Sequence, residues 1–149
     1  MRGDYLAVRR SRTMLVLDAS VVVKLVTLEP GSQEAVAYLA AEDPLIAPDW
    51  VLAEVANAVT RKALAGELPV SAVLPIVETT PDLFAELHPS IELLRRSADL
   101  AIELGHALYD CIYLALAIQI GARLVTADVK FVANAARAGH SRQVEQLTW

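Results

Sequence analysis

The chain has 149 residues, of which 55% are hydrophobic and only 5% aromatic, and its formal net charge is −5. This length fits a single domain with a core of Ala, Val, Leu and Ile, and the composition excludes a disordered chain. The negative charge argues against a general nucleic-acid coat, because non-specific affinity for polyphosphate comes mostly from Lys and Arg.

Residues 1–13 contain four arginines and one aspartate and show no regular apolar period. We expect them to form a basic leader or extension outside the core, with the domain spanning residues 14–149. The longest apolar run, Cys111–Ile118, is far shorter than the ~20 residues that cross a bilayer. The basic start is not followed by a clean signal-peptide cleavage site. We therefore expect a cytoplasmic protein without a membrane segment, and the single cysteine excludes an intramolecular disulfide.

The first half of the chain begins with the apolar run Met14–Leu17, which predicts a strand covered on both faces. The run ends at Asp18, and Ser20 is placed to cap a short helix over residues 21–26. The next predicted elements are a helix over 33–41 after the turn Pro30-Gly31, a strand over 45–47, and a helix from Pro48 to about 62–65 that ends at Gly66.

The second half predicts a helix over 70–79, a strand over 83–87 and a helix from Ser90 to about Gly105. A nearly all-apolar helix over 107–120, a strand over 123–126, a helix over 130–138 and an edge strand over 144–147 follow. Strands that alternate with helices in this way indicate an α/β fold. We expect one domain, an α/β/α sandwich with a mostly parallel central sheet.

Two acidic residues directly follow predicted strands. Asp18 should lie at the carboxyl end of the first strand, where open parallel sheets form ligand crevices, although a helix N-cap would explain it equally well. Asp128 follows the strand over 123–126 in the same manner. The small hydroxyl residues beside them, Ser20 and Thr126, can orient a carboxylate or a metal-bound water, or serve only as local hydroxyl partners of the backbone.

Two further acids lie on predicted helices. Asp110 is the only charged residue in the apolar segment 107–118. A carboxylate buried there needs water, a cation or dedicated donors, although the positive end of the helix dipole is an alternative explanation. Glu54 is surrounded by apolar residues at helical spacing, which indicates either a site or a glutamate at the rim of an apolar stripe.

The four acids together predict a metal site if they converge at one edge of the sheet. Carboxylates that lie so near to one another repel each other unless hard divalent cations neutralise their charges. A site whose ligands are all oxygen atoms favours Mg²⁺ or Mn²⁺ over Zn²⁺. Such ions activate water and stabilise the leaving oxygen in phosphodiester hydrolysis. The candidate catalytic and metal-binding residues are therefore Asp18, Glu54, Asp110 and Asp128.

These segments resemble the PIN-domain nucleases, especially the VapC-type toxins of VapBC toxin-antitoxin pairs. The matching segments are residues 15–20, 52–58, 108–117 and 124–128, in that order. The resemblance implies that the four acids are the metal-site positions, with Ser20 and Thr126 as supporting hydroxyls. It further implies an endoribonuclease dependent on Mg²⁺ or Mn²⁺, a homodimer, and inhibition by a VapB-type antitoxin whose tail occupies the active-site groove.

Two other functions remain open. A Mg²⁺-dependent phosphatase would also use strand-end aspartates, although its haloacid-dehalogenase form would need an Asp where this chain has Ser20. A non-catalytic PIN-like module could instead dock a basic partner peptide in the acidic pocket. The identity of the cleaved RNA cannot be predicted from these residues.

Several basic residues follow the acidic segments and could border an RNA groove, although each is equally explained as a solvated helix charge. They are Lys24, Arg61, Lys62 and Lys130. His106 is interpreted as a polar residue at a helix start rather than as a general base. None of these five is part of the predicted site.

Overall fold

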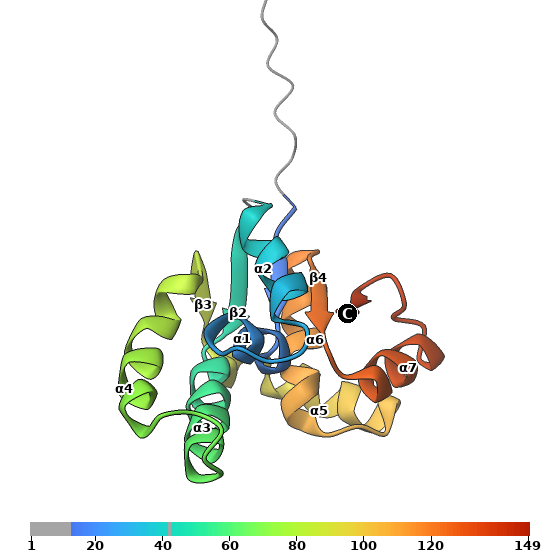
Figure 1. Cartoon of the computed structure of the whole chain (residues 1–149). Coiled ribbons are helices and arrows are strands. Elements are labelled where there is room, and N and C mark those ends of the chain that lie inside the picture. The colour runs from blue at the N-terminus through green and yellow to red at the C-terminus, as the bar shows by residue number, and fades with distance from the viewer. Residues whose placement is uncertain (1–12, 42) are drawn as a thin grey trace, which may run out of the picture.

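Figure 1 shows the computed structural model of the chain, of which residues 13–41 and 43–149 are described. A five-stranded sheet has the order β3-β2-β1-β4-β5, and every neighbouring pair is parallel. The strands are β1 (Leu15–Leu17), β2 (Leu45–Pro48), β3 (Glu86–His88), β4 (Arg123–Thr126) and β5 (Val144–Gln146). The predicted α/β fold is confirmed, and the sheet is parallel throughout. The predicted leader, apart from Thr13, lies outside the described residues.

Seven α-helices and one 3₁₀ helix occur in the described part of the chain. They are α1 (Ala19–Val26), α2 (Ser32–Ala40), α3 (Trp50–Leu64), α4 (Val70–Thr79), η1 (Thr80–Leu83), α5 (Ser90–Leu104), α6 (Leu108–Ile120) and α7 (Val129–Arg137). Helix α6 contacts β1, β2 and β4 from one face of the sheet and α5 packs against it, whereas α1 and α2 lie on the other face (Figure 1). Helices on both faces are what a parallel sheet requires.

The core lies where α6 meets the central strands. Every residue from Cys111 to Ala117 is buried, and so are all residues of β1 and β2. Both surfaces of α6 are covered, by the sheet and by α5, which explains an apolar sequence without a polar face.

Three predicted boundaries were wrong. The helix predicted from Pro48 begins at Trp50, because Pro48 is the last residue of the neighbouring strand β2. Helix α1 begins at Ala19 rather than at residue 21, because the side chain of Asp18, and not Ser20, accepts the hydrogen bond that caps the helix. The predicted strand over 83–87 begins later, at Glu86, because the chain forms the 3₁₀ helix η1 first. Pro81 lies in the first turn of η1, where its fixed φ and missing N–H are tolerated.

No single helix among residues 13–41 and 43–149 is long and apolar enough to cross a membrane. Helices α5 and α6 have the length and apolar composition of a membrane span only when they are taken together, and the chain bends by 113° between them.

Candidate metal centre

The carboxyl ends of β1 and β4 bring two of the predicted acids to one edge of the sheet. The strands are neighbours, with Leu17 beside Val125, so the residues that follow them lie side by side. Asp18 caps α1 by accepting from the Val21 amide at 3.2 Å, and Asp128 caps α7 in the same way. Each cap uses only Oδ1 of the carboxylate, so capping and metal binding are compatible.

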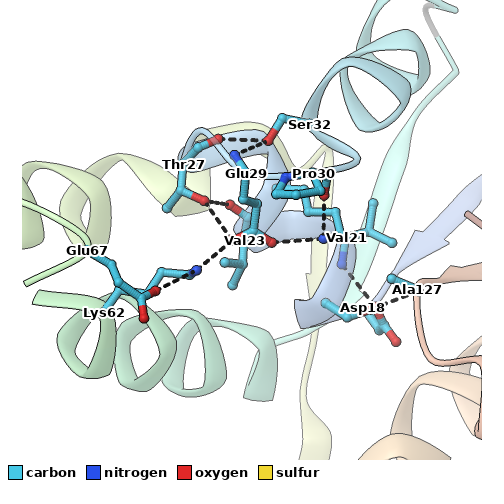
Figure 2. A network of polar contacts seen from close by, with 12 residues as sticks. Asp18, Val21, Val23, Thr27, Glu29, Pro30, Ser32, Lys62, Glu67 and Ala127 are labelled. Carbon is cyan, nitrogen blue, oxygen red and sulfur yellow. Dashed lines mark hydrogen bonds and ion pairs between the residues drawn. The ribbon is translucent and has the colours of Figure 1, made fainter. Parts of the chain in front are cut away.

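The two hydroxyl residues tie these strand ends together. The Ser20 hydroxyl donates to Asp18 Oδ1 at 2.5 Å and accepts from the Ala127 amide at 2.9 Å, which links α1 to the loop after β4. The buried Thr126 hydroxyl accepts from the Asp128 amide at 3.1 Å. Asp18, Val21 and Ala127 can be followed in Figure 2. Both hydroxyls therefore lie beside the acids that the sequence analysis paired them with.

Asp110 lies in the first turn of α6 and contacts a histidine that the sequence analysis excluded. Nε2 of His106 is 2.8 Å from Asp110 Oδ2 and 3.8 Å from Asp128 Oδ2. One potential ligand atom from each of these three side chains lies within 4.8 Å of the other two. The interpretation of His106 as a simple helix-start residue was incomplete, although its position four residues before Asp110 was a usable signal.

The hydrogen bonds around His106 determine which nitrogen carries its proton. Arg137 donates to Oδ1 of Asn134 at 2.5 Å, which orients the amide so that its Nδ2 donates to Nδ1 of His106 at 3.0 Å. Nδ1 is then an acceptor, and in the neutral ring Nε2 is the donor that faces Asp110. His106 therefore positions the carboxylate of Asp110 and has no free lone pair for a metal ion in this arrangement.

Glu54 reaches the same region from α3, near Asp110 and Asp18. The hydroxyl of Tyr113 donates to Glu54 Oε2, and the ring of Tyr113 is fully buried one helical turn after Asp110. The sequence analysis assigned no role to Tyr113. A buried donor of this kind fixes the orientation of the carboxylate.

The acids lie close enough together for the charge of one to raise the pKa of another. Burial and, to a smaller extent, the charge of Asp110 raise the pKa of Asp18 to about 6, against the lowering effect of the hydrogen bonds that it accepts. Burial also raises the pKa of Glu54 to about 7, with the charges of Asp110 and Asp18 adding to the shift. Each of these carboxylates is thus disfavoured as an anion by its surroundings.

Asp110 connects these two acids with Asp128. Burial raises its pKa, the contact with His106 lowers it, and the charge of Asp128 raises it. All four predicted acids therefore belong to one electrostatically coupled group. Four clustered carboxylates, with hydroxyls and a histidine that orient them, form a donor set that suits a hard divalent cation such as Mg²⁺ or Mn²⁺.

A pocket of about 520 Å³ opens beside this cluster. Its lining includes Glu54 and Asp128 of the site together with Asn57, Arg61 and Trp149. Its volume is within the range of small-molecule ligand pockets. A larger pocket of about 870 Å³ lies next to it but contains none of the four acids.

The predicted basic residues differ in their surroundings. Arg61 and Lys24 both line the acidic pocket. Lys24 and Lys62 form ion pairs with Glu29, at 2.9 and 2.7 Å, and Glu29 and Lys62 are visible in Figure 2. Lys130 is exposed. Two of the four basic residues that could have bordered an RNA groove are therefore engaged in an internal ion-pair network.

Comparison with known proteins agrees with the resemblance seen in the sequence. The family model described as PIN domain matches residues 15–137. The curated protein Ribonuclease VapC3 from Pyrobaculum aerophilum is 33% identical over 116 residues, which cover 76% of this chain and 88% of that protein.

Two solved structures share the fold at lower sequence identity. PAE2754 from Pyrobaculum aerophilum superposes with a TM-score of 0.66 at 21% identity, covering 92% of this chain and 91% of that one. FitAcB from Neisseria gonorrhoeae gives a TM-score of 0.61 at 20% identity, covering 91% of this chain and 97% of that one. The family model, the relative and the all-parallel sheet together lead to one conclusion: the chain belongs to the PIN-domain family.

Proposed function

We propose that this protein is a metal-dependent endoribonuclease and the toxin of a toxin-antitoxin pair, with Mg²⁺ or Mn²⁺ held by Asp18, Glu54, Asp110 and Asp128. The observation that carries the proposal is the convergence of these four carboxyls at the carboxyl edge of the sheet, with raised pKa values for three of them. The similarity to Ribonuclease VapC3 supports RNA as the substrate.

The residues of the chain have separable roles in this proposal. A bound divalent ion supplies activation of water and neutralisation of phosphate charge. Asp18 and Asp128 are fixed as ligands by their caps and by the hydroxyls of Ser20 and Thr126. The buried donors beside Glu54 and Asp110 hold those carboxylates in one orientation, so that little reorganisation is needed when the cation binds.

The proposal includes a VapB-type antitoxin, a homodimer and a cytoplasmic location. The name of the relative supports the antitoxin. Val70 and Leu74, four residues apart on α4, are 76% and 69% exposed. Burial of these two side chains against a second subunit would remove apolar surface from water, which supports the homodimer.

Cleavage of a defined RNA by the purified protein tests the proposal. We expect cleavage that needs added Mg²⁺ or Mn²⁺, stops with EDTA and is reduced at least 100-fold in Asp110→Asn. Asp99→Asn is a matched control, because Asp99 is exposed on α5 and outside the site. Equal cleavage by both variants, or turnover of a small phosphate ester without any RNA cleavage, would contradict the proposal.

A binding module without catalysis gives a different result. It would bind a basic peptide or RNA but leave RNA intact with either metal ion. The same assay therefore separates the two functions, provided that binding is measured beside cleavage.

A further inference from the structure

Trp50 carries a buried indole N–H beside the candidate metal centre. It is the first residue of α3, and Glu54 follows one turn later, so the two side chains leave the helix on the same face. Nε1 of Trp50 is buried, and no residue among 13–41 and 43–149 accepts its proton in a hydrogen bond. A buried donor without an acceptor costs free energy, so the functional state of the protein should supply one.

The carboxylate of Glu54 is the acceptor near this N–H. Burial raises the pKa of Glu54 to about 7, and the indole of Trp50 is one of the two donors that lower it. The N–H therefore lies close to the carboxylate without the full geometry of a hydrogen bond. The other donor is the Tyr113 hydroxyl, which donates to Oε2. A carboxylate has about four lone-pair sites, so Glu54 can accept from both donors and still ligate a cation.

The indole is held by an aromatic stack between the two helices that carry Glu54 and Asp110. The ring centroids of Trp50 and Tyr109 are 5.1 Å apart, and the ring planes differ by 12°. Tyr109 directly precedes Asp110 in the first turn of α6. One turn later on the same face of α6, Tyr113 contacts Glu54. The stack thus repeats, one turn earlier on both helices, the contact between Tyr113 and Glu54.

The backbone of Trp50 is anchored as well. Its amide donates to the Ser90 hydroxyl at 3.0 Å, and that hydroxyl donates to Oδ1 of Asp49 at 2.5 Å. These bonds tie the start of α3 to the start of α5, and α5 packs against α6. Backbone and ring are both fixed, so the indole N–H stays beside the carboxylate of Glu54 before a cation binds.

We propose that Trp50 is a positioning residue of the metal centre, and that its indole N–H becomes the second donor to Glu54 when this carboxylate ligates a cation. The inference rests on the proposed metal-dependent function and adds a residue to its site. Glu54 is ionised when it ligates a cation, and an ionised carboxylate is the stronger acceptor. Donors that orient a ligating carboxylate strengthen metal binding, and Tyr109 contributes by holding the indole in place.

NMR of the indole groups tests the donor directly, because the chain has only two tryptophans. Each indole N–H gives one proton–nitrogen cross-peak, and the peak lost in Trp50→Phe or kept in Trp149→Phe is that of Trp50. We expect Mg²⁺ at pH 7 to move the Trp50 proton resonance of the wild-type protein downfield, as a stronger hydrogen bond does. In Glu54→Ala, which lacks the acceptor, Mg²⁺ should leave this resonance in place. An unmoved resonance in the wild type, or equal movement in Glu54→Ala, would overturn the inference.

A double-mutant cycle on Mn²⁺ affinity, measured by calorimetry, separates this role from packing. Trp50→Phe keeps a ring that can stack on Tyr109 but lacks the N–H, and it should weaken Mn²⁺ binding roughly tenfold. The same substitution in Glu54→Ala protein should cause no further loss, because the acceptor is already absent. An unchanged affinity in Trp50→Phe, or an equal loss with and without Glu54, would overturn the inference.

Tyr38→Phe is the matched control for this cycle. The Tyr38 hydroxyl donates to the carboxylate of Glu145 on β5, outside the group of four acids. The variant therefore also removes an aromatic donor from a glutamate, and its affinity for Mn²⁺ should equal that of the wild type. A tenfold loss in Tyr38→Phe would show that the effect of Trp50→Phe is not specific to the metal centre, which would overturn the inference.

The inference and the proposed function fail on different readouts. RNA cleavage by the wild-type protein, together with an unmoved Trp50 resonance, would refute the positioning role and leave the nuclease function standing. A moved resonance and weaker Mn²⁺ binding in Trp50→Phe, without any RNA cleavage by the wild type, would refute the nuclease function and leave the positioning role standing. A wild-type protein that binds neither ion would overturn both.

Discussion

Asp18→Asn should stabilise the metal-free protein near neutral pH while it removes a metal ligand. Burial and the charge of Asp110 raise the pKa of Asp18 from its ordinary 3.8 to about 6. Each pKa unit corresponds to ~1.4 kcal/mol, so the ionised carboxylate lowers the free energy of unfolding by about 3 kcal/mol at most. Asparagine caps helices as well as aspartate does and can accept from Ser20, so the cap at Val21 is retained.

The sign of the pH dependence follows from the raised pKa. Between pH 4 and 6 the native state binds more protons at Asp18 than the unfolded state does, so the stability of wild-type protein falls as pH rises through this window. Asparagine does not titrate. The stability difference between Asp18→Asn and wild type should therefore grow in favour of the variant by about 2.4 kcal/mol from pH 4 to pH 7.

Urea denaturation in EDTA at pH 4, 5, 6, 7 and 8 measures this difference. Asp99→Asn, at an exposed position on α5, should follow the wild type at every pH. Addition of Mn²⁺ should reverse the order at pH 7, because the ion stabilises only the protein that binds it. A difference between variant and wild type that is constant with pH, or that grows in favour of the wild type in EDTA, would refute the reasoning.

Three further variants test how the neighbouring side chains hold the site. Tyr113→Phe removes the hydroxyl that donates to Glu54 and should lower kcat for RNA about 10- to 100-fold with a normal far-UV spectrum; unchanged kcat would contradict the orienting role. Ser20→Ala loses the hydrogen bonds to Asp18 and to the Ala127 amide and should lower the free energy of unfolding by roughly 1–3 kcal/mol in urea titrations. An unchanged urea midpoint would argue against a stabilising link between α1 and the loop after β4 through this hydroxyl. His106→Ala should weaken Mn²⁺ binding, measured by calorimetry, about 10- to 100-fold. His106→Gln restores a hydrogen-bond donor to Asp110 and should regain most of the affinity. Equal losses of affinity in both variants would indicate that His106 ligates the metal directly.

The sequence predicted the parts of the site that follow from local pattern. An apolar run that ends in an acid predicts a strand end, and two such runs, before Asp18 and Asp128, did lie side by side. A lone charge in an apolar helix marked Asp110, and the structure places it in the first turn of α6. The alternation of strands and helices was sufficient for the sheet, because parallel connections need a crossover between strands.

The features of the site that the sequence did not predict depend on contacts between residues far apart in the chain. The bond from Ser20 to Ala127 spans 107 positions and that from Tyr113 to Glu54 spans 59, and no local period indicates either. The same is true of the pairing of Glu29 with Lys62, a contact that the sequence analysis did not predict for Lys62. Caps and helix starts also depend on which of two nearby side chains reaches the amide, as with Asp18 in place of Ser20.

The most direct test of the metal centre is the anomalous difference map of a crystal soaked in Mn²⁺. We predict a peak at the carboxyl edge of the sheet, with carboxylate oxygens of Asp18, Asp110 and Asp128 at about 2.0–2.2 Å and Glu54 in direct or water-mediated contact. The peak should be absent from crystals of Asp110→Asn soaked in the same way. A map without a peak at this edge in the wild-type crystal, or with Mn²⁺ bound only elsewhere, would contradict the assignment.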